Sequence, residues 1–547
     1  TWSQRAGQRL NRKELSCMDI LKNKKGSVMP LVLIVLTISV IFGFTSLSMM
    51  DSQSKFNTAD DSGKKAIEYA EAGYNYYLWH LNDNVNFYST AESEDIQGVD
   101  IPFMDGFYRL EVTKPSDTDR FITIKSTGWA KSRPDIKRTI EAKIRKKQFV
   151  HYVYVSDNDG KEIWWTSGDE SHGPYHTNKD FYTTEGSKVY NNTLGKYVYY
   201  PVFFDTVSYS GSHTESIRSS YRGDAYLAGE PKKVGELVFP QTNSQMKAWA
   251  QKDNMVFYGR TCIYLDGENI KIRNGNAASA TTIPQSSIKN GVIYVDKAIG
   301  GGTGKFDLKT GNIFISGTLK GTLTIAAAND IYITWSDPTN WYDYSASDLN
   351  NISVVPNQPP KEYTWAGGSI HSYPEFGGIE YYSTAFTPSY KPSGKDYYIR
   401  EASGKDMLGL VANSDIFILH YGWPKMSVDG DKPYWNFEWI KSGSKWVKSA
   451  SSDTYYDVAP KEVTIHSAVF AVNGGFGFES YRTGDRRGDI TLWGNITQKI
   501  RQAVGTIGST GYNKKYSHDA RMFYDYPPHI LEPANVGWEI HSWSEIN

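Results

Sequence analysis

The longest apolar run in the chain lies near its beginning. Residues 27–50 (SVMPLVLIVLTISVIFGFTSLSMM) contain no charged side chain over 24 positions. As an α-helix this run would be about 36 Å long, which is enough to cross a lipid bilayer. It exceeds the apolar core of a cleaved secretory signal and carries no A-x-A-like site. We therefore predict a transmembrane helix over residues 27–50.

The charges that flank this run predict its orientation. Residues 1–26 hold seven basic and two acidic side chains, whereas Asp51 follows the run immediately. The positive-inside rule makes residues 1–26 a cytoplasmic basic leader and places the rest of the chain outside, at the cell surface. Met18, at the start of the stretch MDILKNKKG, is a candidate translation start.

Helical periodicity returns after the apolar run. Residues 58–82 begin with Thr and Asp residues suited to cap a helix, and apolar side chains then recur every three or four positions. We predict an amphipathic helix here, with Gly63 as a joint between it and the membrane helix.

Three runs with period-two alternation follow, at residues 106–113, 121–130 and 137–145. Turns rich in Gly, Pro and Asp separate them, which predicts antiparallel strands. The expected fold of residues 51–148 is therefore a helix packed on an antiparallel sheet, an α+β module.

Beyond residue 148 the composition shifts to Tyr, Trp, Gly and Ser, which predicts a mainly β body over residues 149–547. Short apolar runs lie at residues 292–295, 313–315, 323–325, 331–333, 416–418, 463–465, 468–472 and 490–493. Between residues 291 and 335 they recur about every 8–11 residues. This spacing favours the stacked coils of a right-handed β-solenoid, with a sandwich of short strands as the alternative. Residues 336–405 and 422–460 are expected to be long loops or insertions.

The charge balance and the cysteines argue against some classes of function. The chain has 59 basic and 60 acidic side chains, so it has no net field that would attract nucleic acid. Its two cysteines, Cys17 and Cys262, lie on opposite sides of the predicted membrane helix and are not expected to pair. Cysteine-based zinc sites are excluded, and no cofactor or nucleic-acid partner is expected.

The residues around the start of the apolar run resemble a known family. Lys24-Lys25-Gly26 followed by Ser27 is similar to the class III leader of type IV prepilins and type II secretion pseudopilins. The resemblance implies cleavage between Gly26 and Ser27 by a membrane aspartyl prepilin peptidase. Leu31 stands where most major pilins carry Glu, so the chain is more similar to tip-type minor pilins. Residues 66–73 (AIEYAEAG) resemble the A-x-x-A-A-E-A-G segment of PilX-like N-terminal regions.

The body resembles a domain without assigned function that follows PilX-like N-termini in Gram-positive and deep-branching bacteria. Residues 173–178, 290–295, 408–412 and 488–528 carry this resemblance. Both resemblances imply a membrane-anchored, pilin-like surface protein with a structural or assembly role in a type IV pilus or a related machine. The implied partners are the membrane, prepilin peptidase, and other pilins or pilus assembly proteins.

Catalytic signatures are missing from the sequence, so no enzyme is expected. It contains no G-x-S-x-G, H-E-x-x-H, P-loop or dinucleotide-binding motif. Asp169, His172 and His176 are a weak metal candidate, and a turn with hydrogen-bonded histidines is favoured instead. Residues 157–160 (DNDG) begin like a calcium loop but lack the distal Glu, which indicates a plain turn.

Residues 484–489 (GDRRGD) are open to two functional interpretations. Their carboxylates and arginines match the acid and base of a β-helix polysaccharide lyase, and residues 487–489 form an RGD tripeptide. A charged corner with surface side chains explains them without function and is favoured. An adhesin-like module that binds polysaccharide or another surface is thus the alternative to the structural role, and a carbohydrate-active enzyme is the least favoured hypothesis.

Overall fold

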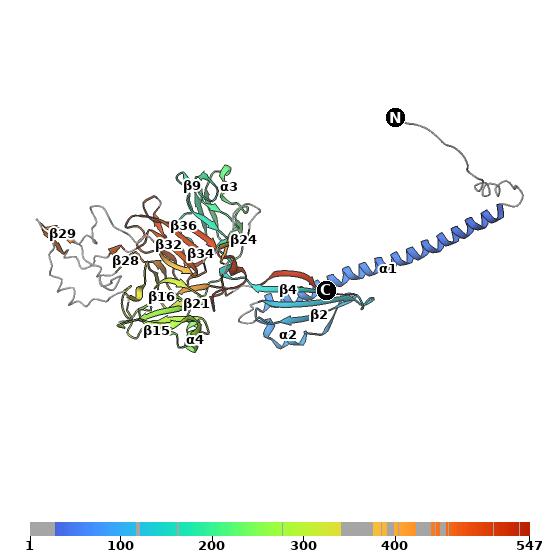
Figure 1. The fold of residues 1–547 in the computed structure, drawn as a ribbon, viewed down its shortest axis with the longest axis horizontal. Helices are drawn as coiled ribbons and strands as arrows, with labels where there is room; N and C mark the ends of the chain where they lie inside the picture. The colour runs from blue at the N-terminus through green and yellow to red at the C-terminus, as the bar shows by residue number, and fades with distance from the viewer. Residues whose placement is uncertain are drawn as a thin grey trace, which may run out of the picture. The chain divides into compact units, whose positions relative to one another are not determined.

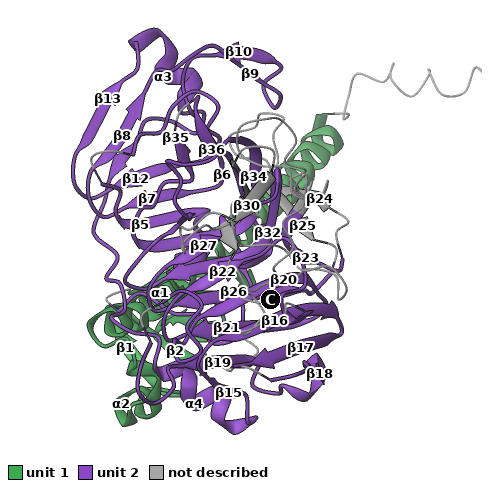
Figure 2. Cartoon of the chain, turned by 90° about the vertical axis from the view of Figure 1, so that its left-hand side faces the viewer, with its two compact units in different colours: residues 1–146, 537–547 green, residues 147–536 purple. Residues whose placement is uncertain are grey.

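A computed structural model describes most of the chain, which divides into two compact units (Figure 2). The described residues are 28–115, 121–160, 163–275, 277–302, 304–340, 376–383, 386–390, 399–402, 404–422, 439–442, 445–448, 456–457, 459–506, 508–534 and 537–546. Unit 1 comprises residues 1–146 with 537–547, and unit 2 comprises residues 147–536. Each unit has a hydrophobic core of its own.

Unit 1 begins with one continuous helix, α1 (Val28–Asp83) (Figure 1). Its 56 residues correspond to about 84 Å. The membrane helix and the amphipathic helix predicted separately are therefore a single element, and Gly63 is not a joint. One glycine costs only about 1 kcal/mol in a helix interior. The ion pair between Asp60 and Lys64, with 2.8 Å between Oδ2 and Nζ, spans the turn that contains Gly63.

The second half of α1 packs on a five-stranded antiparallel sheet. Its strands, in spatial order, are β1 (Asp100–Phe103), β2 (Gly106–Thr113), β3 (Ile122–Ala130), β4 (Lys137–Lys146) and β37 (Trp538–Ile546), and a short helix α2 (Ala91–Asp95) precedes them in sequence. The three predicted strands are confirmed as β2, β3 and β4, with bounds that agree within one residue. Period-two alternation was sufficient to predict these strands because one face of the sheet is buried under the helix.

The fifth strand of this sheet, β37, comes from the far end of the chain. It pairs antiparallel with β4, and an ion pair of 2.8 Å joins Arg138 to Glu545 across 407 residues of sequence. Trp538 lies in the core and donates its indole N–H to the Val85 carbonyl at 2.9 Å. The body predicted from the sequence extends to residue 547, whereas in the structure the last strand belongs to unit 1. The local sequence pattern carries no information about a partner this distant along the chain.

Small residues allow α1 to lie close to the sheet. A Cβ added to Gly128 of β3 would lie 2.2 Å from the Ala66 carbonyl oxygen and 2.4 Å from the Ala70 amide nitrogen. A Cβ added to Gly73 would lie 2.3 Å from Ser126 Oγ. The helix and strand backbones are therefore in direct contact, and the small residues of the segment 66–73 serve packing within unit 1.

Unit 2 is built mainly from one 22-stranded sheet. Its strands are β5 (Tyr154–Asn158), β6 (Glu170–His172), β7 (Tyr175–Thr177), β11 (Val202–Phe203), β12 (Val207–Tyr209), β14 (Lys232–Lys233), β15 (Val256–Tyr258), β16 (Thr261–Gly267), β17 (Asn269–Asn274), β18 (Thr281–Pro284), β19 (Val292–Asp296), β20 (Ile313–Leu319), β21 (Thr322–Ala327), β22 (Ile331–Ile333), β23 (Phe376–Tyr381), β26 (Met407–Ala412), β27 (Ile416–Ile418), β32 (Glu462–Ala471), β33 (Phe476–Phe478), β34 (Arg486–Ile500), β35 (Gly505–Thr506) and β36 (Thr510–His518). Most of its pairings are parallel, and the antiparallel ones involve β16 to β18 and β35 with β36.

Smaller elements complete unit 2. They are the parallel pair β8 (Phe181–Thr184) and β13 (His213–Ser216), the antiparallel pairs β9 (Val189–Asn191) with β10 (Lys196–Val198), β24 (Phe386–Tyr390) with β25 (Ile399–Ala402), β28 (Tyr421–Gly422) with β31 (Tyr456–Asp457) and β29 (Trp439–Ser442) with β30 (Lys445–Lys448), and the helices α3 (Ser219–Ala225) and α4 (Gln245–Lys252).

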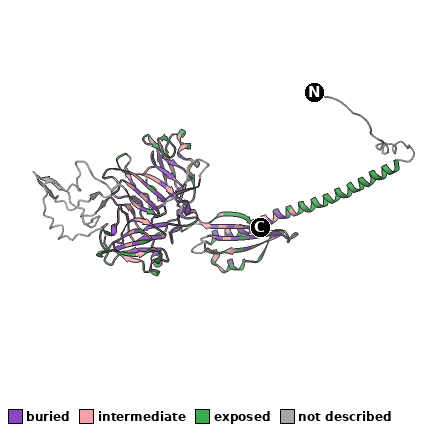
Figure 3. Cartoon of the chain, in the orientation of Figure 1, coloured by how far each residue is buried: buried purple, intermediate pink, exposed green. Residues whose placement is uncertain are grey.

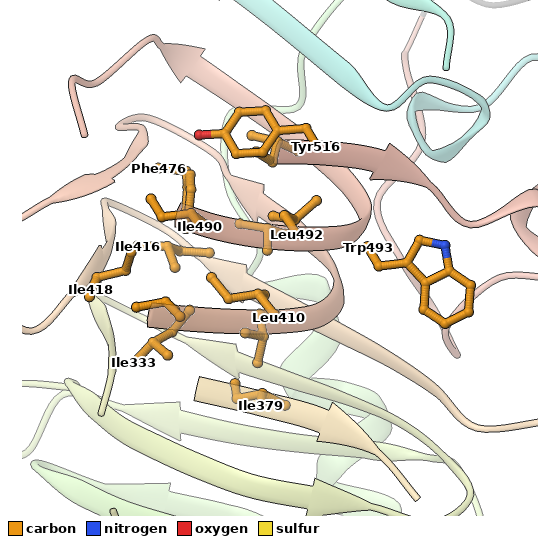
Figure 4. Packing of buried hydrophobic residues seen from close by; sticks show 14 of the residues in the cluster. Ile333, Ile379, Leu410, Ile416, Ile418, Phe476, Ile490, Leu492, Trp493 and Tyr516 are labelled. Atoms are coloured by element: carbon orange, nitrogen blue, oxygen red, sulfur yellow. The ribbon is translucent and has the colours of Figure 1, made fainter. Parts of the chain in front are cut away.

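Parallel strands of unit 2 stack so that equivalent apolar side chains lie beside one another. One such ladder joins Ile293, Ile325, Leu410, Val469 and Ile496, each directly opposite the next. All are buried, and Figure 4 shows neighbouring side chains of the same core. The apolar runs recognised in the sequence are confirmed as parts of β19, β20, β21, β22, β27, β32 and β34.

The prediction of loops over residues 336–405 is wrong for β23. This strand pairs in parallel with β20 and β32, and its Ile379 and Tyr381 are fully buried. This strand contains two glycines and only two apolar core positions, and aromatic and polar residues surround it. Its sequence therefore shows no apolar run that would mark a strand. Residues 341–375, 391–398 and 423–438 lie outside the described residues.

The chain enters its large sheet in the middle. β5 pairs with β34 on one side and with β7 on the other, and β6 pairs with β36. From β5 the chain proceeds to β14, and after α4 it resumes at β15 and continues to β36 in sequence order. Strands from the beginning and the end of unit 2 thus meet directly. We call the contact of β5 and β6 with β34 and β36 the seam.

Candidate functional site

The first half of α1 is apolar and exposed. Every described side chain from Val28 to Thr58 is exposed, and the first charge is Asp51 (Figure 3). Buried positions begin at Ser62 and continue to Leu81, on the side of the helix that faces the sheet. Within the described chain, α1 is the helix that is long and apolar enough to cross a membrane. The predicted processing residues, Gly26 and Ser27, lie outside the described residues, directly before it.

The structure gives Asp169 and His172 different partners. Asp169 directly precedes β6, and His172 is the last residue of that strand. Asp169 accepts hydrogen bonds from Lys514 Nζ at 2.8 Å and from the Thr166 amide at 3.1 Å. His172 Nε2 lies 2.9 Å from Glu170 Oε2. These two candidate ligands do not converge.

His176 is engaged elsewhere. Its Nδ1 lies 3.0 Å from Ser208 Oγ and its Nε2 lies 2.9 Å from Asn178 Oδ1. Burial lowers the pKa of His176 to about 4, so its ring is neutral near pH 7. In the described part of the chain, no three His, Cys, Asp or Glu side chains are placed to hold a metal ion.

Residues 157–160 form a turn whose side chains diverge. Asn158 Oδ1 accepts from the Gly160 amide at 2.9 Å, as in an Asx turn. The Asp157 carboxylate lies 2.8 Å from Lys499 Nζ. Asp159 points into the core instead. Residues 157–160 therefore resemble a calcium-binding loop in sequence but not in the arrangement of their side chains.

Residues 484–489 are only partly at the surface. Arg486 is exposed and begins β34, whereas Arg487 is buried and donates to the Ala459 carbonyl at 2.8 Å. Asp489 Oδ1 accepts from the Asn513 side-chain amide at 2.9 Å. The expectation that all charges here are surface corner residues is wrong for Arg487, because it faces inward on a strand.

Arg487→Ala is expected to lower the free energy of unfolding by about 1–3 kcal/mol, because it leaves a buried carbonyl without this donor and empties packed space. Arg486→Ala is the matched control, one residue away and exposed, and should change it by less than about 0.5 kcal/mol. Urea unfolding of both variants measures the difference. Equal effects would contradict the burial of Arg487.

A buried polar cluster of unit 2 lies at the seam and was not recognised in the sequence. Arg501 Nη1 lies 3.0 Å from Asp159 Oδ2, and both side chains are almost completely buried. The Arg501 guanidinium lies 4.7 Å from the ring centre of Trp165, a cation–π contact. Asp159 also accepts hydrogen bonds from the hydroxyls of Ser156 and Tyr175.

Two further ion pairs cross the seam beside it, Lys514–Asp169 and Lys515–Glu170. Burial alone would raise the pKa of Glu170, but its contacts with His172 and Lys515 outweigh burial and lower the pKa to about 2. Burial lowers the pKa of Lys514, against the attraction of Asp169. Together with Lys499–Asp157 and Arg501–Asp159, these pairs give the seam four described ion pairs, which join distant parts of the chain.

None of the protein-family models, characterised proteins or solved structures compared with the chain matches it. Function is therefore inferred from the chain's own geometry.

Proposed function

We propose that this chain is a membrane-anchored, pilin-like surface protein with a structural or assembly role in a type IV pilus or a related machine. One observation carries the proposal: α1 is a single helix whose apolar first half is exposed and whose second half packs on an antiparallel sheet. A long apolar surface in water is unfavourable, so it needs a bilayer or other apolar helices around it.

The orientation in this proposal rests on charge. Residues 1–26 are basic and are assigned to the cytoplasm, which leaves the antiparallel sheet of unit 1 and all of unit 2 outside. The partners in this proposal are the membrane, prepilin peptidase, and other pilins or assembly proteins.

In the same proposal, unit 2 is a solenoid of stacked coils presented at the surface. In-register parallel ladders such as Ile325–Leu410–Val469 support it, since coils of this kind bury their faces only against one another. Right-handedness remains part of the proposal.

Gly26→Val tests the pilin-like assignment. A peptidase that requires a small residue before the cut should fail on this variant, and its N-terminus should stay upstream of residue 26. The wild-type chain extracted from membranes should begin at Ser27. N-terminal mass spectrometry measures both, and Gly43→Val is the matched control, because nothing lies within 4 Å of a Cβ at Gly43. A wild-type chain that retains Gly26, or a variant that begins at Ser27, contradicts the assignment.

A further inference from the structure

Lys514 and Asp169 face each other inside unit 2. The register of β36 and β6 pairs Lys515 with Glu170 and Tyr516 with Ser171, which sets Lys514 beside Asp169. Lys514 Nζ lies 2.8 Å from Asp169 Oδ2, and the two side chains are 13% and 9% exposed. Tyr516, two positions along the same strand, belongs to the hydrophobic core, so Lys514 is on the inward face.

Aromatic side chains and a second cation surround this pair. Lys514 Nζ lies 5.2 Å from the ring centre of Trp165, which is fully buried. Arg501 contacts the same ring and is positively charged. Burial lowers the pKa of Lys514, and the charge of Arg501 acts in the same direction, whereas Asp169 opposes it. The amine and the carboxyl are thus held together where both charged forms are poorly solvated.

We propose that Lys514 and Asp169 condense to an intramolecular amide between Lys514 Nζ and Asp169 Cγ. The ammonium gives one proton to the carboxylate across their hydrogen bond, which leaves a neutral amine and a carboxylic acid. Nζ then attacks Cγ, the Nζ–Cγ bond forms, and one Cγ–O bond breaks. The leaving hydroxyl takes a second proton from nitrogen and departs as water, while the third stays on the amide.

The surroundings of the pair favour this step in three ways. Alignment of amine and carboxyl on adjacent strands removes most of the entropic barrier to their encounter. The Thr166 backbone N–H donates to Asp169 Oδ2 at 3.1 Å, the oxygen that also accepts from Lys514 Nζ, and so holds the carboxyl in one orientation beside the amine. The amide product is neutral, so condensation removes two charges from the core.

The neighbouring pair Lys515–Glu170 has similar spacing and different surroundings. Its Nζ–Oε1 distance is 2.6 Å, but the Lys515 side chain is 30% exposed. Burial alone would raise the pKa of Glu170, but His172 and Lys515 outweigh this effect and lower the pKa to about 2. Glu170 therefore stays a carboxylate, which is a poor electrophile. This pair is therefore expected to stay ionic and serves as the internal control.

The amide would link residues 345 positions apart and close the seam covalently. It would hold the start of β6 to β36 when the protein is pulled or unfolded. This inference concerns the interior of unit 2 and does not depend on the proposed pilin-like function.

Peptide mass spectrometry of the full-length chain, extracted in detergent and digested under denaturing conditions, tests the proposal. A branched peptide that contains Lys514 and Asp169, lighter than its two parts by one water, is expected in nearly all molecules. Lys514→Arg keeps the positive charge but should abolish the branched peptide, because a guanidinium is a poor nucleophile. Lys515→Arg should retain it.

Linear, unmodified peptides for Asp169 and Lys514 in the wild-type chain would overturn the proposal, even if Lys514→Arg failed to fold. Loss of one water confined to a linear Asp169 peptide would also overturn it, since that indicates a succinimide. A branch between Lys515 and Glu170 would overturn the assignment of the residues.

Discussion

Arg501→Met is expected to lower the free energy of unfolding of unit 2 by about 3–5 kcal/mol, among the largest effects of any single substitution in the chain. Arg501 and Asp159 are 2% and 0% exposed at the side chain, and they form an ion pair of 3.0 Å. Removal of the guanidinium leaves the Asp159 carboxylate buried without its cation. Denaturant unfolding of the full-length chain, followed by tryptophan fluorescence, measures the loss.

Two further variants separate this effect from loss of an ordinary ion pair. Arg218 pairs with Glu185 at 2.7 Å, but its side chain is 65% exposed, so Arg218→Met should cost less than about 1 kcal/mol. Adding Asp159→Asn to Arg501→Met should recover part of the stability, because the uncompensated charge is gone. Similar losses for Arg501→Met and Arg218→Met would contradict a buried pair at the seam.

Local patterns predicted much of the fold because many elements are defined by their neighbours in sequence. Period-two alternation located β2, β3 and β4, where helix α1 covers one face of the sheet. Short apolar runs located β22 and β27 with their exact bounds. A parallel strand that is buried on both faces is a continuous apolar run. It can therefore be recognised without knowing which strand it pairs with.

Long-range pairing could not be predicted from one sequence. The residues of β37 were assigned to the body, yet its partner is β4 of unit 1. The seam is hidden for the same reason, since 342 residues separate Asp159 from Arg501. An arginine just after an apolar strand usually lies at a solvated strand end. Arg501 is buried instead, because β34 pairs with β5.

Nearness along the sequence also suggested a weak metal candidate whose residues the structure separates. Asp169, His172 and His176 lie within eight residues, but they have different partners. Asp169 instead meets Lys514, and spacing within the sequence gave no sign of this contact.

Val35→Arg combined with Ile38→Arg is expected to abolish stable membrane association. Each arginine near the middle of a spanning helix costs about 2.5–3.5 kcal/mol on insertion scales, so the pair costs about 5–7 kcal/mol. The two positions are three residues apart and therefore share one face of α1. Both side chains are more than half exposed, at 57% and 56%, so their replacement should leave the packing of unit 1 intact.

Carbonate washing of isolated membranes, followed by detection of the chain in pellet and supernatant, measures the effect. Val35→Leu combined with Ile38→Leu is the matched control, since it changes the same positions without charge and should remain in the pellet. Unit 1 of the arginine variant should keep the circular dichroism of the wild type, because the core that holds α1 begins beyond Asp61. If the arginine variant stays with the membranes, residues 28–50 are not the anchor, and the exposed apolar half of α1 must instead be covered by other protein.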